Sequence, residues 1–268
     1  MSAVTQHLLL RGEHAATQLH ELGVRRGGVL LVHASMRAVG GAAGDMVHAL
    51  RRALGPEGTL VVPSFTPENS DTSRAYLDRV RGLSEAAGAT VRASMPAFDP
   101  AVSPAPTMGA LAELVRLAPG ARRSSHPQTS FAGLGPAAAQ LLDGHRPDCH
   151  LGEGSPLARL YEADAQVLLL GTGFDSCTAF HLAEYRRPAP PRRLYRCVVA
   201  SGRGRHWWEY EDIALDDSDF ARLGGDFVRA RPGAVSTGRV GAASRLFSLR
   251  AAVEFAVGWF TEHRAAGA

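Results

Sequence analysis

The sequence has 268 residues, 45% of them hydrophobic and 21% charged, and its 29 basic residues, all arginine, stand against 26 acidic ones. These totals are typical of a globular protein with enough chain to bury a core, and the charge is too balanced to indicate a nucleic-acid-binding protein. The lack of lysine excludes a Walker A loop and Schiff-base catalysis, because arginine stays protonated in proteins.

The cysteines and the N-terminal residues bear on the cellular compartment. Cys149, Cys177 and Cys197 are odd in number and contain no CxxC pair, so we expect no disulfide framework and a reducing, cytoplasmic location. The first residues, MSAVTQHLLLRGEH, have no basic start and only a short apolar run. We therefore expect neither a signal peptide nor a membrane span.

The first elements along the chain form a strand–helix–strand unit preceded by a helix. Apolar residues at helical spacing, among them Leu9 and Leu19, predict a helix over 5–22. The apolar runs at 29–33 (VLLVH) and 58–63 (GTLVVP) predict buried strands, and residues 44–54 predict a helix between them. Because a helical crossover joins the two strands, we expect them to pair in parallel.

The middle of the chain is less regular. In residues 64–106, Pro, Ser, Thr and charged residues dominate and periodicity is weak, which predicts a long irregular insertion. Helices are expected at 107–118, 135–142 and 155–163, with a loop over Arg122–Ser130.

A third buried strand, Gln166–Leu170, runs into a Gly-rich turn and a further helix. Beyond it, residues 194–200 and 205–210 predict a hairpin, and residues 216–230 and 248–263 predict helices with a strand between them. Neither a repeat nor a linker interrupts the sequence. We therefore expect one domain over residues 1–268, with three layers, α/β/α, around a central mixed sheet.

The turn after the third strand (GTGFDS) carries the first candidate site, because α/β proteins bind ligands beyond the carboxyl ends of their strands. Asp175 or Ser176 is a candidate helix N-cap, after which Cys177, His181 and Glu184 share one helix face. A histidine beside a carboxylate is a candidate general base. The alternative is an N-cap followed by a structural histidine.

Two other segments place histidines in loops. His33 begins HASMRAVG at the end of the first strand, which either cradles an anionic group or only connects two elements. His126 lies in a loop that follows Arg122 and Arg123, where it either meets a phosphate or is ordinary solvated loop.

Two clusters have the residue types of ligand sites without a familiar spacing. One resembles a metal-ligand set but fits no common zinc pattern, and consists of His145, Asp148, Cys149 and His150. The other is an acidic run beside Trp207 and Trp208 that is either a solvated face or an attractor of polycations, and consists of Glu209, Glu211, Asp212, Asp216, Asp217 and Asp219.

Short stretches spread in order over nearly the whole chain carry a family resemblance. They are Leu22-Gly-Val24, Leu31-Val-His-Ala-Ser35, Gly55-Pro-Glu-Gly-Thr-Leu60, Met95-Pro-Ala-Phe-Asp-Pro100, Met108-Gly109, Ser125-His-Pro127, Leu151-Gly-Glu-Gly-Ser-Pro-Leu157, and Asp175-Ser-Cys-Thr through His181-Leu-Ala-Glu-Tyr-Arg186. The ordered set resembles the aminoglycoside N-acetyltransferases that modify the 3-amino group, whose fold is distinct from that of the GNAT acetyltransferases.

Two positions depart from the family pattern. That pattern usually has serine at Ala34 and asparagine at Cys177, which puts in doubt one hydroxyl contact to CoA and one amide contact in the active-site turn. Neither departure removes His181 or Glu184.

The resemblance implies acetyl-CoA as the donor, no metal, and direct transfer to the 3-amino group of an aminoglycoside in a ternary complex. His181 would act as the general base, with Glu184 or Asp175 orienting it. The contacts expected for CoA are His33, Ser35, Met36, Met108, Gly109 and Ser155. The carboxylates expected to bind the drug are Asp78, Asp99, Glu184, Glu211 and Asp212, with residues 64–95 as a specificity loop.

The expected partners are the aminoglycoside and CoA, with no nucleic acid and no membrane, and a homodimer is left open. The first alternative is an N-acyltransferase of the same fold that acts on a non-antibiotic amine in biosynthesis. Two further alternatives are a non-catalytic CoA- or polyamine-binding protein and a metal-dependent hydrolase built on the His145–His150 cluster.

Overall fold

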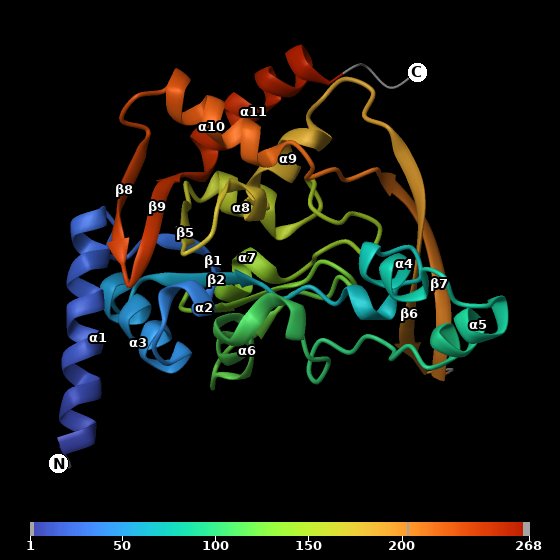
Figure 1. The fold of residues 1–268 in the computed structure, drawn as a ribbon, viewed down its shortest axis with the longest axis horizontal. Helices are drawn as coiled ribbons and strands as arrows, with labels where there is room; N and C mark the ends of the chain where they lie inside the picture. Colours follow the sequence, from blue (N-terminus) through green and yellow to red (C-terminus); the bar gives the residue numbers. More distant parts are fainter. Residues whose placement is uncertain (1–2, 203, 265–268) are drawn as a thin grey trace.

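The computed structural model describes residues 3–202 and 204–264, and its side chains from residue 13 onward. A seven-stranded sheet in the order β3-β4-β2-β1-β5-β9-β8 lies between two layers of helices (Figure 1). Its strands are β1 (Val29–Ala34), β2 (Thr59–Pro63), β3 (Arg122–Arg123), β4 (Phe131–Leu134), β5 (Gln166–Leu170), β8 (Val235–Val240) and β9 (Ala242–Ser248). β1 pairs in parallel with β2 and β5, while β4 and β9 run antiparallel, so the predicted three-layer fold with a mixed sheet is confirmed.

The strands of the sheet's centre are apolar on both faces because helices cover both. On β1, Leu30 and Val32 belong to one hydrophobic core, while Leu31 belongs to the other. This alternation follows from the two-residue period of a strand. β1, β2 and β5 are three of the strands that the sequence predicted, and the parallel pairing of β1 with β2 is confirmed.

The helices divide between these two cores. The first face of the sheet is covered by α1 (Ala3–Leu22), α3 (Ala43–Leu54) and α6 (Gly109–Leu117). The opposite face is covered by α7 (Ala138–Leu142), α8 (Pro156–Glu162), α9 (Ala179–Tyr185), α10 (Phe220–Ala230) and α11 (Leu249–His263). Leu19, whose place in the first helix was predicted from periodicity, is fully buried. Leu9 lies outside the residues whose side chains are described.

The segment predicted as an irregular insertion over residues 64–106 contains two helices, α4 (Arg74–Val80) and α5 (Glu85–Ala93). Both are shorter than three turns, so neither produces a helical period long enough to detect. They lie beside the separate hairpin of β6 (Arg192–Ser201) and β7 (Gly204–Ile213) (Figure 1). Tyr76, Met95 and Val198 form a small hydrophobic core between the insertion and the hairpin.

Two other predictions along the chain were wrong. The expected loop after residue 121 contains β3, and β4 follows it; these strands have only two and four residues, too few to show alternation. The single strand expected between the last two helices is a hairpin of β8 and β9, which turns at Gly241. Gly241 has φ +71°, a conformation that favours glycine.

Candidate active site

A cavity of about 330 Å³ lies where β1, β2 and β5 end. Parallel strands bring their carboxyl ends to one edge of the sheet, so the loops that follow them meet there. The residues that line the cavity are Val32, His33, Ala34, Val62, Pro63, Phe65, Thr107, Met108, Leu111, Ala112, Thr172, Asp175, Ser176, Cys177, Thr178, His181, Asp217 and Phe220. One side of the cavity is therefore apolar, and the other carries hydroxyl, carboxyl and imidazole groups.

A histidine–carboxylate pair stands at the polar side. Both residues come from α9, where Nδ1 of His181 lies 2.6 Å from Oε2 of Glu184. The spacing of three residues places both side chains on one helix face. The Glu184 side chain is only 3% exposed and that of His181 12% exposed. In the neutral tautomer whose Nδ1 donates to the carboxylate, Nε2 is the nitrogen that can accept a proton, and it makes no hydrogen bond within the described part of the chain.

The sequence left open whether Asp175 or Glu184 orients His181, and Glu184 is the one that contacts the His181 ring. Asp175 lines the cavity but makes no hydrogen bond to His181 among the described residues. The prediction that Asp175 or Ser176 caps the helix was wrong. Both belong to a short 3-10 turn, η3 (Phe174–Ser176), and α9 begins only at Ala179.

The turn before α9 is held in place by its aromatic residue. Phe174 packs onto α10 at Gly224, where a Cβ atom would lie 2.0 Å from Cγ of Phe174. Only a glycine admits the ring at this distance. The buried ring therefore fixes the turn that carries Asp175 and Ser176 along the cavity wall, and a helix begins only after it.

His33 is a second histidine of the cavity wall. It sits near the end of β1, and its Nε2 lies 3.1 Å from Oγ1 of Thr178. Burial, and then the nearby His181, lower the pKa of His33 to about 3. An imidazole with so low a pKa stays neutral at physiological pH and cannot draw a proton from an ammonium group. Of the two histidines in this cavity, His181 is therefore the one suited to act as a base.

The residues expected to contact CoA are only partly brought together. His33 and Met108 line the cavity. Ser35 caps the short helix α2 (Met36–Val39) directly beyond β1, and its Oγ accepts from the amide of Ala38. Gly109 follows Met108 at the start of α6.

Ser155 does not take part. It is fully buried at the start of α8, where its hydroxyl donates to the Gly152 carbonyl and accepts from the Leu157 amide. The serine is a helix cap, and its place in the expected CoA set is corrected.

The carboxylates expected to bind the drug are scattered rather than gathered. Asp78 pairs with Arg81 at 2.5 Å on the surface of α4. The Oδ1 atom of Asp99 accepts from the backbone amide of Ala101. Glu211 pairs with Arg192 at 2.5 Å on the outer hairpin. None of the three lines the cavity, because each is fixed on another part of the surface.

Asp212 and Glu184 are also unavailable to a drug. Asp212 is buried and accepts hydrogen bonds from the side chains of His150 and Tyr185. Glu184 is occupied by His181 on one oxygen and by Arg264 on the other. The carboxylates that do line the cavity are Asp175 and Asp217, and Asp217 also pairs with Arg74 of α4 at 3.2 Å.

Cys177 lies beside the catalytic candidates but is fully buried. Burial raises the pKa of its thiol to about 12, so the thiol stays protonated at neutral pH. A protonated thiol is a poor nucleophile, which argues against a covalent acyl-cysteine.

We therefore expect Cys177→Ala to retain kcat within about threefold of the wild type, since a protonated thiol contributes no nucleophile. Its free energy of unfolding should fall by about 1 kcal/mol, the usual scale for a small cavity in a core. Steady-state kinetics and denaturant titration measure the two effects. Burst kinetics with an acetyl group trapped on Cys177 would contradict the expectation.

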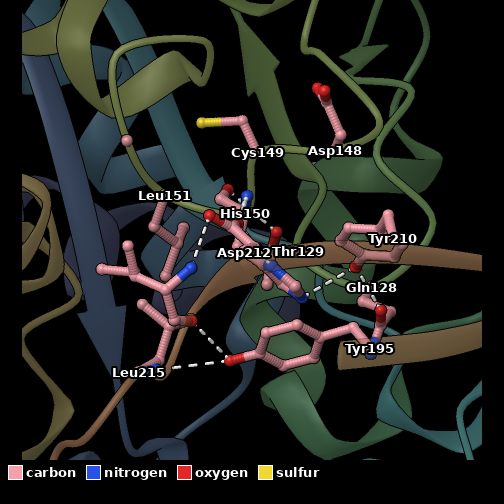
Figure 2. Close-up of polar contacts among 12 residues, drawn as sticks. Gln128, Thr129, Asp148, Cys149, His150, Leu151, Tyr195, Tyr210, Asp212 and Leu215 are labelled. Atoms are coloured by element: carbon pink, nitrogen blue, oxygen red, sulfur yellow. Dashed lines mark hydrogen bonds and ion pairs between the residues drawn. The ribbon is translucent and has the colours of Figure 1, made fainter. Parts of the chain in front are cut away.

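The histidines of the supposed metal cluster have structural partners instead. Figure 2 shows His150 between Asp212 and Tyr210, with Asp148 and Cys149 pointing away from its ring. Nδ1 of His150 lies 2.9 Å from Oδ2 of Asp212, and Nε2 lies 2.9 Å from the Tyr210 hydroxyl. His145 contacts the Ser124 hydroxyl through Nδ1 and backbone carbonyls through Nε2. No group of three or more His, Cys, Asp or Glu residues suited to a metal ion occurs in the described part of the chain.

His126 does not meet a phosphate, because it is fully buried. Its Nδ1 accepts from the backbone amides of Gln128 and Thr129, so the ring holds the turn that leads into β4. Its ring centroid lies 4.8 Å from that of His145 and 4.7 Å from that of His150. The three rings form one buried histidine cluster under the β6–β7 hairpin.

This buried histidine cluster predicts a loss of stability in acid. Burial lowers the pKa of His126, His145 and His150, that of His145 to about 4. The unfolded chain therefore binds more protons than the folded one below about pH 6.5. Stability is fully present above that pH and is lost as the pH falls toward about 4, by about 1.4 kcal/mol per pH unit for each proton taken up.

Denaturant titrations at a series of pH values measure this slope. His145→Gln should give a shallower slope than the wild type. His206→Gln, which removes an exposed histidine from β7, should leave the slope unchanged. Equal slopes for the wild type and His145→Gln would contradict the assignment.

Comparisons with known proteins show which family this chain resembles over most of its length. The family model described as "Aminoglycoside 3-N-acetyltransferase" matches residues 31–261. The chain is 37% identical to the SPbeta prophage-derived aminoglycoside N(3')-acetyltransferase-like protein YokD of Bacillus subtilis, over 90% of this chain and 89% of that protein. It is 37% identical to aminoglycoside N(3)-acetyltransferase III of Serratia marcescens, over 94% and 97% of the two chains.

A solved structure of AAC-IIIb in a binary complex with CoASH superposes with a TM-score of 0.81 at 30% identity, covering 96% of this chain and 98% of that one. Within the described residues, no helix has the length and apolar character needed to cross a membrane.

Proposed function

The chain belongs to the aminoglycoside 3-N-acetyltransferase family and is an acetyl-CoA-dependent aminoglycoside N-acetyltransferase, and we propose that His181 and Glu184 carry out its proton transfer. The acceptor in this proposal is the 3-amino group, which attacks acetyl-CoA directly in a ternary complex. The observation that carries the proposal is the His181–Glu184 hydrogen bond at the polar side of the cavity.

The cavity fits the acyl end of acetyl-CoA, which supplies an activated acetyl thioester. Phe65, Met108 and Leu111 offer apolar contacts for the arm, and Thr172 and Ser176 offer hydroxyls. A volume of about 330 Å³ is at the lower end for ligand pockets, so it suits the acyl arm better than a whole nucleotide.

His181 does the proton work in this proposal. The acceptor amine is largely protonated at neutral pH and must lose a proton before it can attack a carbonyl carbon. Nε2 of His181 takes that proton, while Glu184 holds the ring and stabilises the imidazolium. As the nitrogen–carbon bond forms and the carbon–sulfur bond breaks, His181 gives its proton to the departing sulfur. The neutral imidazole then takes the second proton, which the acylated nitrogen loses, and passes it to water. A backbone N–H or a hydroxyl of the cavity wall stabilises the charge on the carbonyl oxygen.

Asp175 and Asp217 are the carboxylates that we assign to the acceptor. Both line the cavity, so they face the space in which a cationic amine must sit to reach His181. Among the residues that the structure describes, the Asp217 carboxylate pairs with Arg74 alone, at 3.2 Å, and that ion pair is exposed. Exposed ion pairs contribute little free energy and exchange readily for another cation.

A panel of acceptors tests the regiochemistry. Thiol release from acetyl-CoA is measured with aminoglycosides that carry a 3-amino group and with analogues that lack it. We expect turnover only with the first set. Turnover with both sets contradicts the 3-amino assignment, and turnover only with unrelated amines favours a biosynthetic acceptor.

We also propose that the activity confers aminoglycoside resistance. Expression in a susceptible bacterium should raise the minimal inhibitory concentration of a 3-amino aminoglycoside. An equal rise with His181→Ala would contradict resistance by acetylation.

A further inference from the structure

We propose that Arg264 is a positioning residue of the reaction, holding Glu184 against His181 and fixing the segment that carries Asp217 along the cavity wall. The inference rests on the proposed function. Arg264 lies directly after α11, and Glu184 precedes it by 80 residues. Neither the local spacing nor the motifs around His181 indicate it.

The two carboxylate oxygens of Glu184 make different hydrogen bonds. Oε2 meets His181, while Oε1 accepts from Nη1 of Arg264 and from the backbone amide of Asp216. Both oxygens of the carboxylate are thereby fixed, so its plane cannot rotate away from the imidazole. The side chains of Glu184 and Arg264 are 3% and 12% exposed, so water competes little for these contacts.

Arg264 also holds the segment that precedes α10. Arg264 donates from Nε to Oδ2 of Asp219 at 2.8 Å and from Nη2 to the Asp216 carbonyl at 2.7 Å. Asp217, which lines the cavity, lies between these two anchor points. One guanidinium therefore connects the orienting carboxylate and the cavity wall, a bridge that the planar fork of arginine allows.

Two aromatic rings hold the Arg264 guanidinium in place. Its guanidinium carbon lies 3.9 Å from the ring centroid of Phe260 and 6.0 Å from that of Phe220. Phe220 in turn packs against the His181 ring, with centroids 4.7 Å apart. The cation is thus supported by the same aromatic side chain that contacts the catalytic imidazole.

Removing this cation changes the electrostatics around His181. Among the described residues, the charged or titratable groups near the ring include His150, Glu184 on its own helix, His33 on β1, Asp175 and Asp217 in the cavity wall, and Arg264 after α11. Loss of Arg264 leaves the carboxylates in place and removes a positive charge. The positively charged form of the imidazole is then favoured, and the acidic limb of the kcat profile should move to higher pH.

The experiment compares Arg264→Gln and Arg264→Lys with Arg250→Gln as the matched control. Arg250 also anchors α11, because it donates hydrogen bonds to the carbonyls of Tyr161 and Glu162. It contacts neither His181 nor Glu184. We expect Arg264→Gln to lower kcat by about 10- to 100-fold, the scale of a small misplacement of a catalytic group. In a plot of kcat against pH, the acidic limb of Arg264→Gln should lie at higher pH than that of the wild type. Arg264→Lys should give an intermediate kcat, because an ammonium cannot bridge both carboxylates.

Two results would overturn the inference. One is an Arg264→Gln enzyme with kcat within about twofold of the wild type. The other is a fall in kcat with an unmoved acidic limb and no recovery by Arg264→Lys, which identifies a purely structural role that Arg250→Gln would share. If Arg264→Gln does not fold, a wild-type kcat in Arg264→Lys contradicts the inference. A wild type that releases no thiol from acetyl-CoA contradicts the proposed function itself.

Discussion

His181→Ala should lower kcat by about 10²- to 10⁴-fold, the range expected when a general base is lost. The acceptor amine then lacks the imidazole that removes its proton in the bound complex. His33 is the only other histidine lining the cavity within the described residues, and its pKa of about 3 makes it too weak a base. Thiol release at saturating acetyl-CoA and aminoglycoside measures the effect.

The control for this prediction is His206→Gln, since His206 is exposed on β7 and lies outside the cavity. It should keep wild-type turnover. A His181→Ala enzyme with near-wild-type kcat would rule out His181 as the base. Partial recovery at high pH, where the free acceptor amine is more abundant, would support the assignment.

Glu184→Gln should lower kcat by about 10²-fold or more. The amide keeps the size of the side chain but loses the negative charge that stabilises the imidazolium, and it leaves the ring free to adopt the other tautomer. Oε1 of the amide still accepts a hydrogen bond from Arg264, and Arg264 still forms its ion pair with Asp219. The free energy of unfolding should therefore fall by only about 1–3 kcal/mol. Kinetics and denaturant titration separate the two effects.

Glu153→Gln is the matched control, because Glu153 pairs at 2.7 Å with Arg186, the residue directly after α9. That pair is on the surface and is not part of the cavity, so turnover should not change. If Glu184→Gln behaved like Glu153→Gln, the orienting role would be wrong.

Local sequence patterns predicted the parts of the molecule whose contacts are local. The apolar runs that became β1, β2 and β5 are buried on both sides, so their composition identified them without knowledge of their neighbours. Strand ends of a parallel sheet meet at one edge, which is why the candidate site predicted after β5 coincides with a cavity. The contact between His181 and Glu184 was predictable because residues three apart are neighbours on a helix surface.

Short elements and buried polar groups escaped prediction. β4 has four residues, and the helices within 64–106 are short, so no period could be read from them. His126 and His145 looked like ligands because residue type does not reveal burial. Packing under the hairpin gives Nδ1 of His126 and both ring nitrogens of His145 backbone or hydroxyl partners instead.

The sequence by itself therefore determined the reaction class and its limits. Its ordered motifs identified the family, and the absence of lysine excluded Schiff-base catalysis and made every basic residue other than histidine an arginine. Only the tertiary structure showed which carboxylate contacts His181, that Asp217 rather than Asp212 lines the cavity, and that Arg264 reaches Glu184 from 80 residues away. Spacing along a helix fixes contacts within a few residues, whereas contacts between distant segments arise only when the layers pack.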